Sequence, residues 1–77
     1  MEDKIEARFL ELEEKLKNLS EEDRQRVRDA YEYAKAHHEG QLRKDGTPYI
    51  THCIAAADIS VDMGLDEDSI VAALLHD

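Results

Sequence analysis

The chain is 77 residues long, with 38% charged residues and a formal net charge of −9 at pH 7. This length allows one small domain at most, which would bury only roughly 60% of the surface of the unfolded chain. The single cysteine, Cys53, excludes a disulfide framework and indicates a reducing compartment. No signal peptide is visible and no apolar run approaches the ~20 residues of a membrane span, so we expect a cytoplasmic protein without a membrane partner.

Acidic residues dominate the last third of the sequence. Residues 53–77 contain six acids and neither lysine nor arginine. Because binding to double-stranded nucleic acid needs clustered lysine and arginine, we expect no nucleic-acid partner. An acidic segment can attract a divalent cation or can be a solvated face that aids solubility, and charge alone favours the second.

The first predicted element is an amphipathic helix over roughly residues 3–18. Its apolar residues recur at intervals of four and three and form one stripe of Ile5, Phe9, Leu12, Leu16 and Leu19. An isolated helix of this length is marginal in water, so the stripe should pack on the rest of the domain or on a partner chain. We favour packing within the domain, because barely two heptads are present for a coiled coil.

A second helix is predicted over about residues 21–39. Ser20 should cap it, with Asp23 as the acid of a capping-box variant, and Gly40 should end it. The helical period places the following residues on its inner face: Val27, Ala30, Tyr31, Ala34 and His38.

Residues 41–50 are predicted to form a loop. Asp45-Gly46 is typical of a tight turn, and Pro48 restrains the backbone that follows. A third helix should then run from about residue 51 to residue 63.

The fourth predicted helix begins after Asp66, which can cap it. It continues to Asp77 without the glycine, asparagine or cation that usually closes a helix. Its core positions are Ile70, Ala73 and Leu74. No strand pattern is present, so the predicted fold class is all-α, with three to four helices.

His76 and Asp77 together are a candidate metal site. Adjacent residues of a helix point about 100° apart, so both side chains can reach one ion beside it. Imidazole with carboxylate suits Mn, Fe or Zn. His52 lies 24 positions before His76 and can supply a third ligand if the third and fourth helices are antiparallel. These residues alone do not establish a metal site, since a lone histidine near an apolar face is more often a core residue.

Two longer stretches resemble a known family. Residues 31–52 read YEYAKAHHEGQLRKDGTPYITH, and residues 64–77 read GLDEDSIVAALLHD. They contain the patterns AxxxHxGQxRKxGxPYIxH and AALLHD. The sequence closely resembles the N-terminal hydrolase domain of the RelA/SpoT family, which are bifunctional guanosine tetraphosphate synthetase/hydrolases. That domain belongs to the HD superfamily of metal-dependent phosphohydrolases.

The resemblance also divides the chain. It covers most of residues 20–77 and none of residues 1–19. We therefore expect an N-terminal amphipathic helix over residues 1–19 and a partial HD hydrolase domain over residues 20–77.

The resemblance implies roles for five residues. His52 falls on the first metal-binding histidine of the family, and His76 and Asp77 fall on its His-Asp pair. The implied metal is manganese, which polarises the 3′-diphosphate and activates the attacking water. Arg43 and Lys44 match the basic pair that approaches the guanine nucleotide, with a solvated loop as the alternative. An arginine plane can stack on a base while a lysine offers a point charge to phosphate.

Four further positions complete the comparison with the family. Tyr49 should pack the loop onto the core, His38 should be structural or lie behind the ligands, and His37 should be exposed. Cys53 stands where the family usually has proline, and we expect a small buried residue there in preference to an extra ligand.

The catalytic Glu-Asp pair of the family and its fourth metal ligand both lie past Asp77, as do the synthetase and regulatory domains. The resemblance thus implies that this chain contains no catalytic residue and is inactive by itself. It also explains the ending VAALLHD, as half of a metal site.

The first functional hypothesis is the N-terminal fragment of a manganese-dependent guanosine tetraphosphate 3′-diphosphohydrolase. Its parent is expected also to be a GTP pyrophosphokinase acting in the stringent response. The second hypothesis is a non-catalytic helical module that forms homo-oligomers through the Ile5–Leu19 stripe or through exposed truncated core. The third is another HD-superfamily nucleotide phosphohydrolase, against which the Arg43-Lys44 loop argues.

Overall fold

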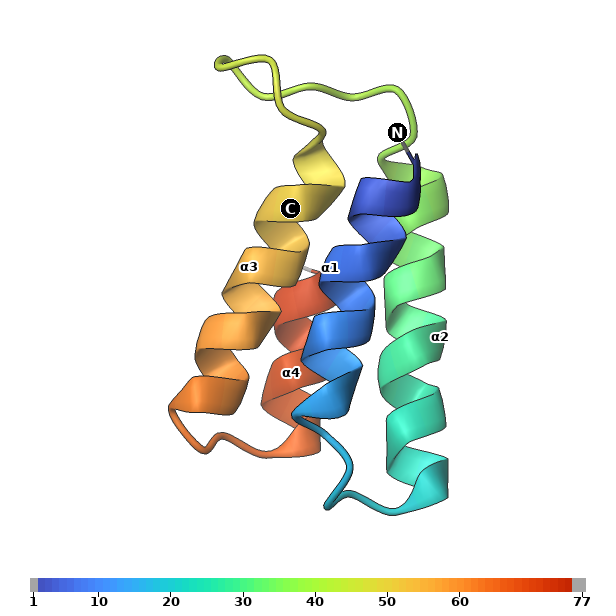
Figure 1. Ribbon diagram of the computed structural model, residues 1–77, viewed down its shortest axis with the longest axis vertical. Coiled ribbons are helices and arrows are strands. Elements are labelled where there is room, and N and C mark those ends of the chain that lie inside the picture. Colours follow the sequence, from blue (N-terminus) through green and yellow to red (C-terminus); the bar gives the residue numbers. More distant parts are fainter. Residues whose placement is uncertain (1, 76–77) are drawn as a thin grey trace.

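The computed structural model describes the backbone of residues 2–75 and the side chains of residues 4–75. This part of the chain contains no strand and four helices, which are α1 (Glu2–Glu14), α2 (Glu21–His37), α3 (Tyr49–Asp62) and α4 (Glu67–Leu75). Consecutive helices run in opposite directions (Figure 1). Helix α4 packs against α2 and α3, and α1 packs against α3. The all-α prediction is confirmed.

All four helices contribute to one hydrophobic core. Its buried members are Phe9, Leu12, Leu16, Val27, Ala30, Tyr31, Ala34, Ile50, Cys53, Ile54, Ala57, Ile70 and Leu74. The rings of Phe9 and Tyr31 stack with centroids 3.9 Å apart and planes 4° from parallel, which joins α1 to α2. The division of the chain at residue 19 follows the family resemblance and not the packing, and it stays a prediction.

The apolar stripe of the N-terminal segment is covered by the rest of the chain. Phe9, Leu12 and Leu16 are buried, and Ile5 and Leu19 pack partly buried against the core. The prediction that the stripe packs within the domain is confirmed. A homo-oligomer held together by this stripe does not fit the structure, because the apolar faces that it needs are already buried within one chain.

Helix α1 ends about four residues earlier than predicted. The backbone N–H of Lys15 donates to the carbonyl of Leu12 at 3.0 Å, a three-residue step that tightens the last turn. The chain then changes direction while Leu16 remains buried. Lys15 Nζ lies 2.8 Å from a carboxylate oxygen of Asp58 and 2.8 Å from one of Asp62, which ties the end of α1 to α3.

The predicted caps of α2 and α4 are confirmed. Ser20 Oγ accepts a hydrogen bond from the backbone N–H of Asp23 at 3.1 Å. Asp66 Oδ1 accepts one from the backbone N–H of Ser69 at 3.0 Å, and this bonding lowers the pKa of the Asp66 carboxyl. Both side chains satisfy an amide that the first helical turn leaves without a partner.

Helix α3 begins two residues earlier than predicted, at Tyr49. Pro48 occupies the position before the helix with φ −59°, and its carbonyl accepts hydrogen bonds from the backbone N–H of Thr51 at 3.1 Å and from the Thr51 hydroxyl. Because proline is locked near the helical φ, it prepares the chain for a helix directly after it. Tyr49 and His52 consequently lie three residues apart, on neighbouring positions of the first turn.

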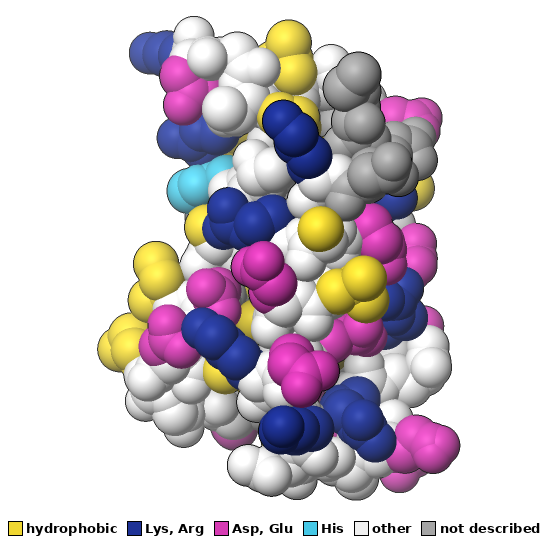
Figure 2. All heavy atoms as spheres, in the orientation of Figure 1, with side chains coloured by type: hydrophobic (Ala, Val, Ile, Leu, Met, Phe, Trp, Pro, Cys, Tyr) yellow, Lys and Arg dark blue, Asp and Glu magenta, His cyan; other side chains and the backbone are white. Residues whose placement is uncertain are grey.

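Charged side chains of both signs cover the face seen in Figure 2, with small and scattered hydrophobic areas between them. This interspersed pattern is typical of a solvated helical surface. Among the described residues, no helix is both long enough and apolar enough to span a membrane.

Candidate metal and nucleotide site

The loop between α2 and α3 forms a defined turn at one end of the helices (Figure 1). The backbone N–H of Arg43 donates to the carbonyl of Thr47 at 2.8 Å, and that of Gly46 donates to the carbonyl of Arg43 at 2.9 Å. Asp45 Oδ1 accepts from the Thr47 hydroxyl at 2.7 Å and from the Thr47 backbone at 3.0 Å, which lowers the pKa of the Asp45 carboxyl. The turn therefore presents Arg43 and Lys44, both exposed, on a bonded backbone.

The base of this loop is held by His38 and Gln41. His38 is the one buried polar residue among the described side chains, with 7% of its surface exposed. Its Nδ1 lies 3.0 Å from Gln41 Oε1, while Gln41 Nε2 faces the carbonyl of His37 at 3.5 Å. With the amide in this orientation, Nδ1 of His38 faces an acceptor oxygen. This burial and this bond fit the expectation that His38 is structural or lies behind the ligands.

Tyr49 connects the loop to the core. Its backbone N–H donates to the carbonyl of Gln41 at 3.0 Å, and its ring centroid lies 4.5 Å from that of His38. The Arg43 guanidinium carbon lies 6.0 Å from the centroid of the Tyr49 ring. As expected, Tyr49 packs the loop onto the core, and it does so with a half-buried ring over which Arg43 also lies.

A groove at this loop contains both residues of the predicted basic pair. It is lined by Leu42, Arg43, Lys44, Asp45 and Tyr49. A planar guanidinium, a ring and an ammonium group around one groove are suited to a ligand with a flat ring and phosphate groups.

His52, the predicted metal ligand, lies in the first turn of α3. Its ring packs edge-on against that of Tyr49, with centroids 5.9 Å apart and planes at 70°. The antiparallel helix α4 rises about 13 Å over its nine residues, against about 21 Å for the fourteen residues of α3, so its described end stops short of the first turn of α3 (Figure 1). His76 and Asp77 lie outside the described residues, and no three potential ligands among residues 4–75 lie close enough together to hold a metal ion. The complete ligand set stays a prediction.

Cys53, beside His52, is fully buried in the core. Its burial fits the expected role of a small core residue. The role of Gln41 could not be predicted from the sequence. The only signal was its fixed place in the motif, which says nothing of the imidazole that it contacts.

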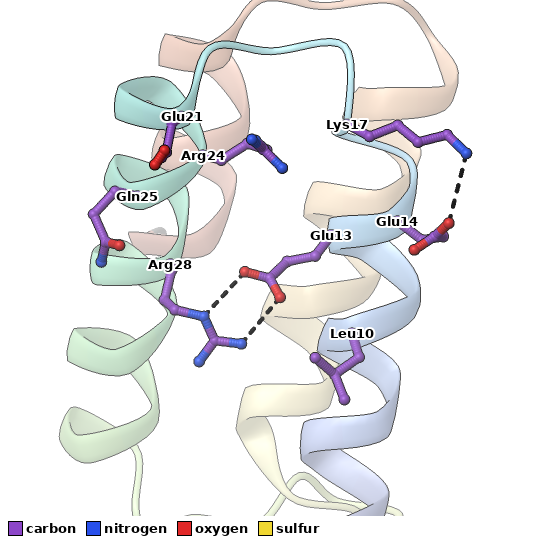
Figure 3. A pocket seen from close by; sticks show the side chains of 8 residues that line it. All are labelled: Leu10, Glu13, Glu14, Lys17, Glu21, Arg24, Gln25 and Arg28. Carbon is purple, nitrogen blue, oxygen red and sulfur yellow. Dashed lines mark hydrogen bonds and ion pairs between the residues drawn. The ribbon is translucent and has the colours of Figure 1, made fainter.

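A second groove, between α1 and α2, is spanned by the ion pair of Arg28 and Glu13. Figure 3 shows Arg28 reaching both carboxylate oxygens of Glu13, and Lys17 beside Glu14 at 3.6 Å. Because the opposite charges in these pairs neutralise each other, this groove fits a role in stability better than one in chemistry.

The sequence of the chain is similar to those of known proteins. Residues 30–77 match the model of the HD domain, and the chain belongs to this family of helical domains. Within the family its sequence is of the RelA/SpoT type. It is 51% identical over 59 residues to the bifunctional (p)ppGpp synthase/hydrolase SpoT of Escherichia coli K12, covering 77% of this chain and 8% of the relative.

Two other relatives come from distant bacteria. The bifunctional (p)ppGpp synthase/hydrolase RelA of Mycobacterium tuberculosis is 54% identical over 48 residues, which is 62% of this chain and 6% of the relative. The GTP pyrophosphokinase of Myxococcus xanthus is 49% identical over 51 residues, or 66% of this chain and 7% of the relative. The chain thus spans less than a tenth of the length of these relatives, and the match to the HD domain begins within α2.

Proposed function

We propose that this chain is part of a manganese-dependent guanosine tetraphosphate 3′-diphosphohydrolase. The observation that carries the proposal is that Arg43, facing the Tyr49 ring, and His52, packed against the same ring, lie at one end of the bundle. The 51% identity to SpoT of Escherichia coli, whose name includes (p)ppGpp hydrolase, supports the same substrate class.

The two basic residues would bind the nucleotide. The Arg43 guanidinium is planar and can stack on a purine or bind a diphosphate through two parallel hydrogen bonds. Lys44 would supply a point charge to a phosphate group, without a fixed direction. The Asp45 carboxylate stays ionised and is held back by Thr47, so that it shapes the turn without blocking the cations.

His52 would supply a neutral imidazole nitrogen to the metal, with His76 and Asp77 as the proposed partners. Among the described residues, His52 fits this role because it is half-buried at the end of the bundle that the loop crosses. A bound manganese ion would polarise a phosphoryl oxygen and lower the pKa of a water molecule. The resemblance assigns the proton-moving acids of the family to no residue of this chain, so we expect hydrolysis to need more of the protein than these residues.

The first experiment is a calorimetric titration of Mn²⁺ into the 77-residue chain. His52→Ala should weaken binding by roughly tenfold or more, because a first ligand is lost. His37→Ala is the matched control, since this histidine is exposed on α2 and should not affect the metal. Equal losses in the two variants would contradict the assignment of His52.

The second experiment measures the reaction. The whole protein that carries this segment should release diphosphate from guanosine tetraphosphate only when Mn²⁺ is present. Arg43→Ala should raise KM more than it lowers kcat, because it removes binding to the nucleotide. Metal-independent release would contradict the proposal. Release from any nucleoside polyphosphate at the same rate would favour another hydrolase of the HD superfamily.

A non-catalytic self-association module is the second candidate function. It is favoured by apolar side chains on the surface of α2 and α4, where Tyr33 is 65% exposed and Leu75 44% exposed beside Val71. Exposed apolar groups that line one groove can mark a contact surface. Sedimentation of the chain as a monomer at high concentration would exclude this candidate.

A further inference from the structure

Aromatic and imidazole rings form a continuous row from α2 to the first turn of α3. The centroid distances along the row are 6.0, 5.0, 4.5 and 5.9 Å, and its members in order are Tyr33, His37, His38, Tyr49 and His52. The row crosses from the end of α2 to the start of α3, at the base of the loop that joins them.

Tyr49 differs from the other rings because two functional residues contact it at once. The Arg43 guanidinium carbon lies 6.0 Å from its centroid, and the His52 ring packs edge-on against it at 5.9 Å. The basic residue and the imidazole are nine positions apart in sequence and belong to a loop and a helix. The Tyr49 ring is therefore a contact that both share.

The Tyr49 ring is also held in place. Its backbone N–H bonds to Gln41, and its ring lies 4.5 Å from His38, which is itself buried and bonded to Gln41. A ring with a fixed backbone and a buried neighbour has few alternative rotamers. The Arg43 guanidinium over this ring and the His52 ring edge-on to it are thus positioned against the same ordered side chain.

We infer that Tyr49 is a positioning residue that couples the orientation of Arg43 to that of His52. This inference rests on the proposed function, in which Arg43 binds the nucleotide and His52 binds the metal. Occupation of the nucleotide groove would then change the affinity of the metal site, and metal binding would change nucleotide affinity by the same factor, since such coupling is reciprocal.

The test is a double-substitution experiment read by NMR of the His52 ring protons in the 77-residue chain. Arg43→Gln should shift these resonances in the otherwise unsubstituted chain and in Tyr49→Phe, which keeps the ring. It should leave them unshifted in Tyr49→Leu, which removes the ring. This difference isolates the part of the His52 shift that is transmitted through the Tyr49 ring.

Tyr33→Leu is the matched control, because Tyr33 lies at the far end of the row and contacts neither functional residue in the ring contacts given above. In that background the shift caused by Arg43→Gln should persist. The inference is overturned if Arg43→Gln leaves His52 unshifted in the unsubstituted chain, or shifts it equally in Tyr49→Leu. The first of these outcomes decides the matter even if Tyr49→Leu does not fold.

A second readout separates this inference from the proposed function. Tyr49→Leu should weaken Mn²⁺ binding by roughly tenfold, the effect typical of a residue that orients a ligand, while Tyr49→Phe should change it much less. If Mn²⁺ affinity is the same in His52→Ala and in the unsubstituted chain, the proposed function fails. If His52→Ala weakens binding and Tyr49→Leu does not, the coupling alone fails.

Discussion

Arg28 of α2 and Glu13 of α1 form a bidentate ion pair, in which the Nε and Nη2 atoms each lie 3.0 Å from a different carboxylate oxygen (Figure 3). The same guanidinium lies 3.2 Å from Glu6 and 5.0 Å from the centroid of the Phe9 ring. These bonds, with the one to Glu13 the strongest cause, raise the pKa of Arg28. A single side chain thus holds α1 to α2 by charge and by contact with a ring.

Removal of the ion pair between Arg28 and Glu13 should destabilise the fold. Arg28→Ala should lower the free energy of unfolding by about 2 kcal/mol, because charge-assisted hydrogen bonds are lost and Glu13 keeps no partner in this cluster. Arg28→Lys should lose less of this free energy than Arg28→Ala, but it should not match arginine, since an ammonium group cannot form two parallel bonds. Lys17→Ala is the control and should change the free energy by less than about 0.5 kcal/mol, because its pair with Glu14 is 3.6 Å long and well exposed. Urea unfolding followed by circular dichroism measures these effects, and equal losses in Arg28→Ala and Lys17→Ala would contradict the prediction.

Stability should fall in acid because of Glu6. Partial burial raises the pKa of this carboxyl, but hydrogen bonds from Arg28 and Tyr31 outweigh burial and bring it below the ordinary 4.5. A carboxyl with a lowered folded pKa contributes stability that is present above 4.5 and is lost as the pH falls through the folded pKa. The melting temperature should therefore decline less steeply below pH 4.5 in Glu6→Gln than in the unsubstituted chain. Glu11→Gln, exposed on the same helix, should keep the original slope, and a flattened slope there would show that general charge repulsion is the cause.

Two adjacent leucines at the end of α4 should behave differently. Leu74 is fully buried, whereas Leu75 is 44% exposed. Leu74→Ala should cost about 3 kcal/mol through lost burial and a cavity, and Leu75→Ala less than about 1 kcal/mol. Thermal unfolding of both variants measures this difference. Similar losses would mean that the end of α4 does not pack as the structure shows.

Most of the fold could be predicted because each helix has a local signal. Ser20 and Asp66 were recognisable as caps from residue type and position alone, and both make the expected hydrogen bond. The end of α1 could not be predicted in this way. Leu16 keeps the apolar spacing although the backbone has already left the α-helix, because a tight turn preserves nearly the same period.

The candidate site could be predicted in its residue types but not in its contacts. Arg43, Lys44 and His52 follow from a motif at fixed spacing, and two of them now share a contact with the Tyr49 ring. The bond between His38 and Gln41 depends on how the chain folds back after α2, which no periodicity describes.

Gly46 should matter for the nucleotide and not for the helices. Its φ of 87° lies in the left-handed region, which disfavours residues with a Cβ by about 1–2 kcal/mol. A Cβ there would meet nothing within 4 Å, so the cost of alanine is conformational strain without a clash. The N–H of Gly46 bonds to the carbonyl of Arg43 at 2.9 Å, so the strained turn would move the residue that is proposed to bind the nucleotide.

Gly64 offers a matched control for this prediction. It has φ 74° and equally open surroundings, but it lies between α3 and α4 at the opposite end of α3 from the Arg43 loop. Gly46→Ala and Gly64→Ala should therefore lower the free energy of unfolding by similar amounts, while only Gly46→Ala should weaken binding of guanosine tetraphosphate. Gly46→Asn should retain most of the affinity, because asparagine adopts this conformation more readily than alanine. Calorimetric titration with guanosine tetraphosphate measures the affinity of all three variants. An equal loss of affinity in Gly64→Ala would show that global stability, and not the shape of the turn, controls binding.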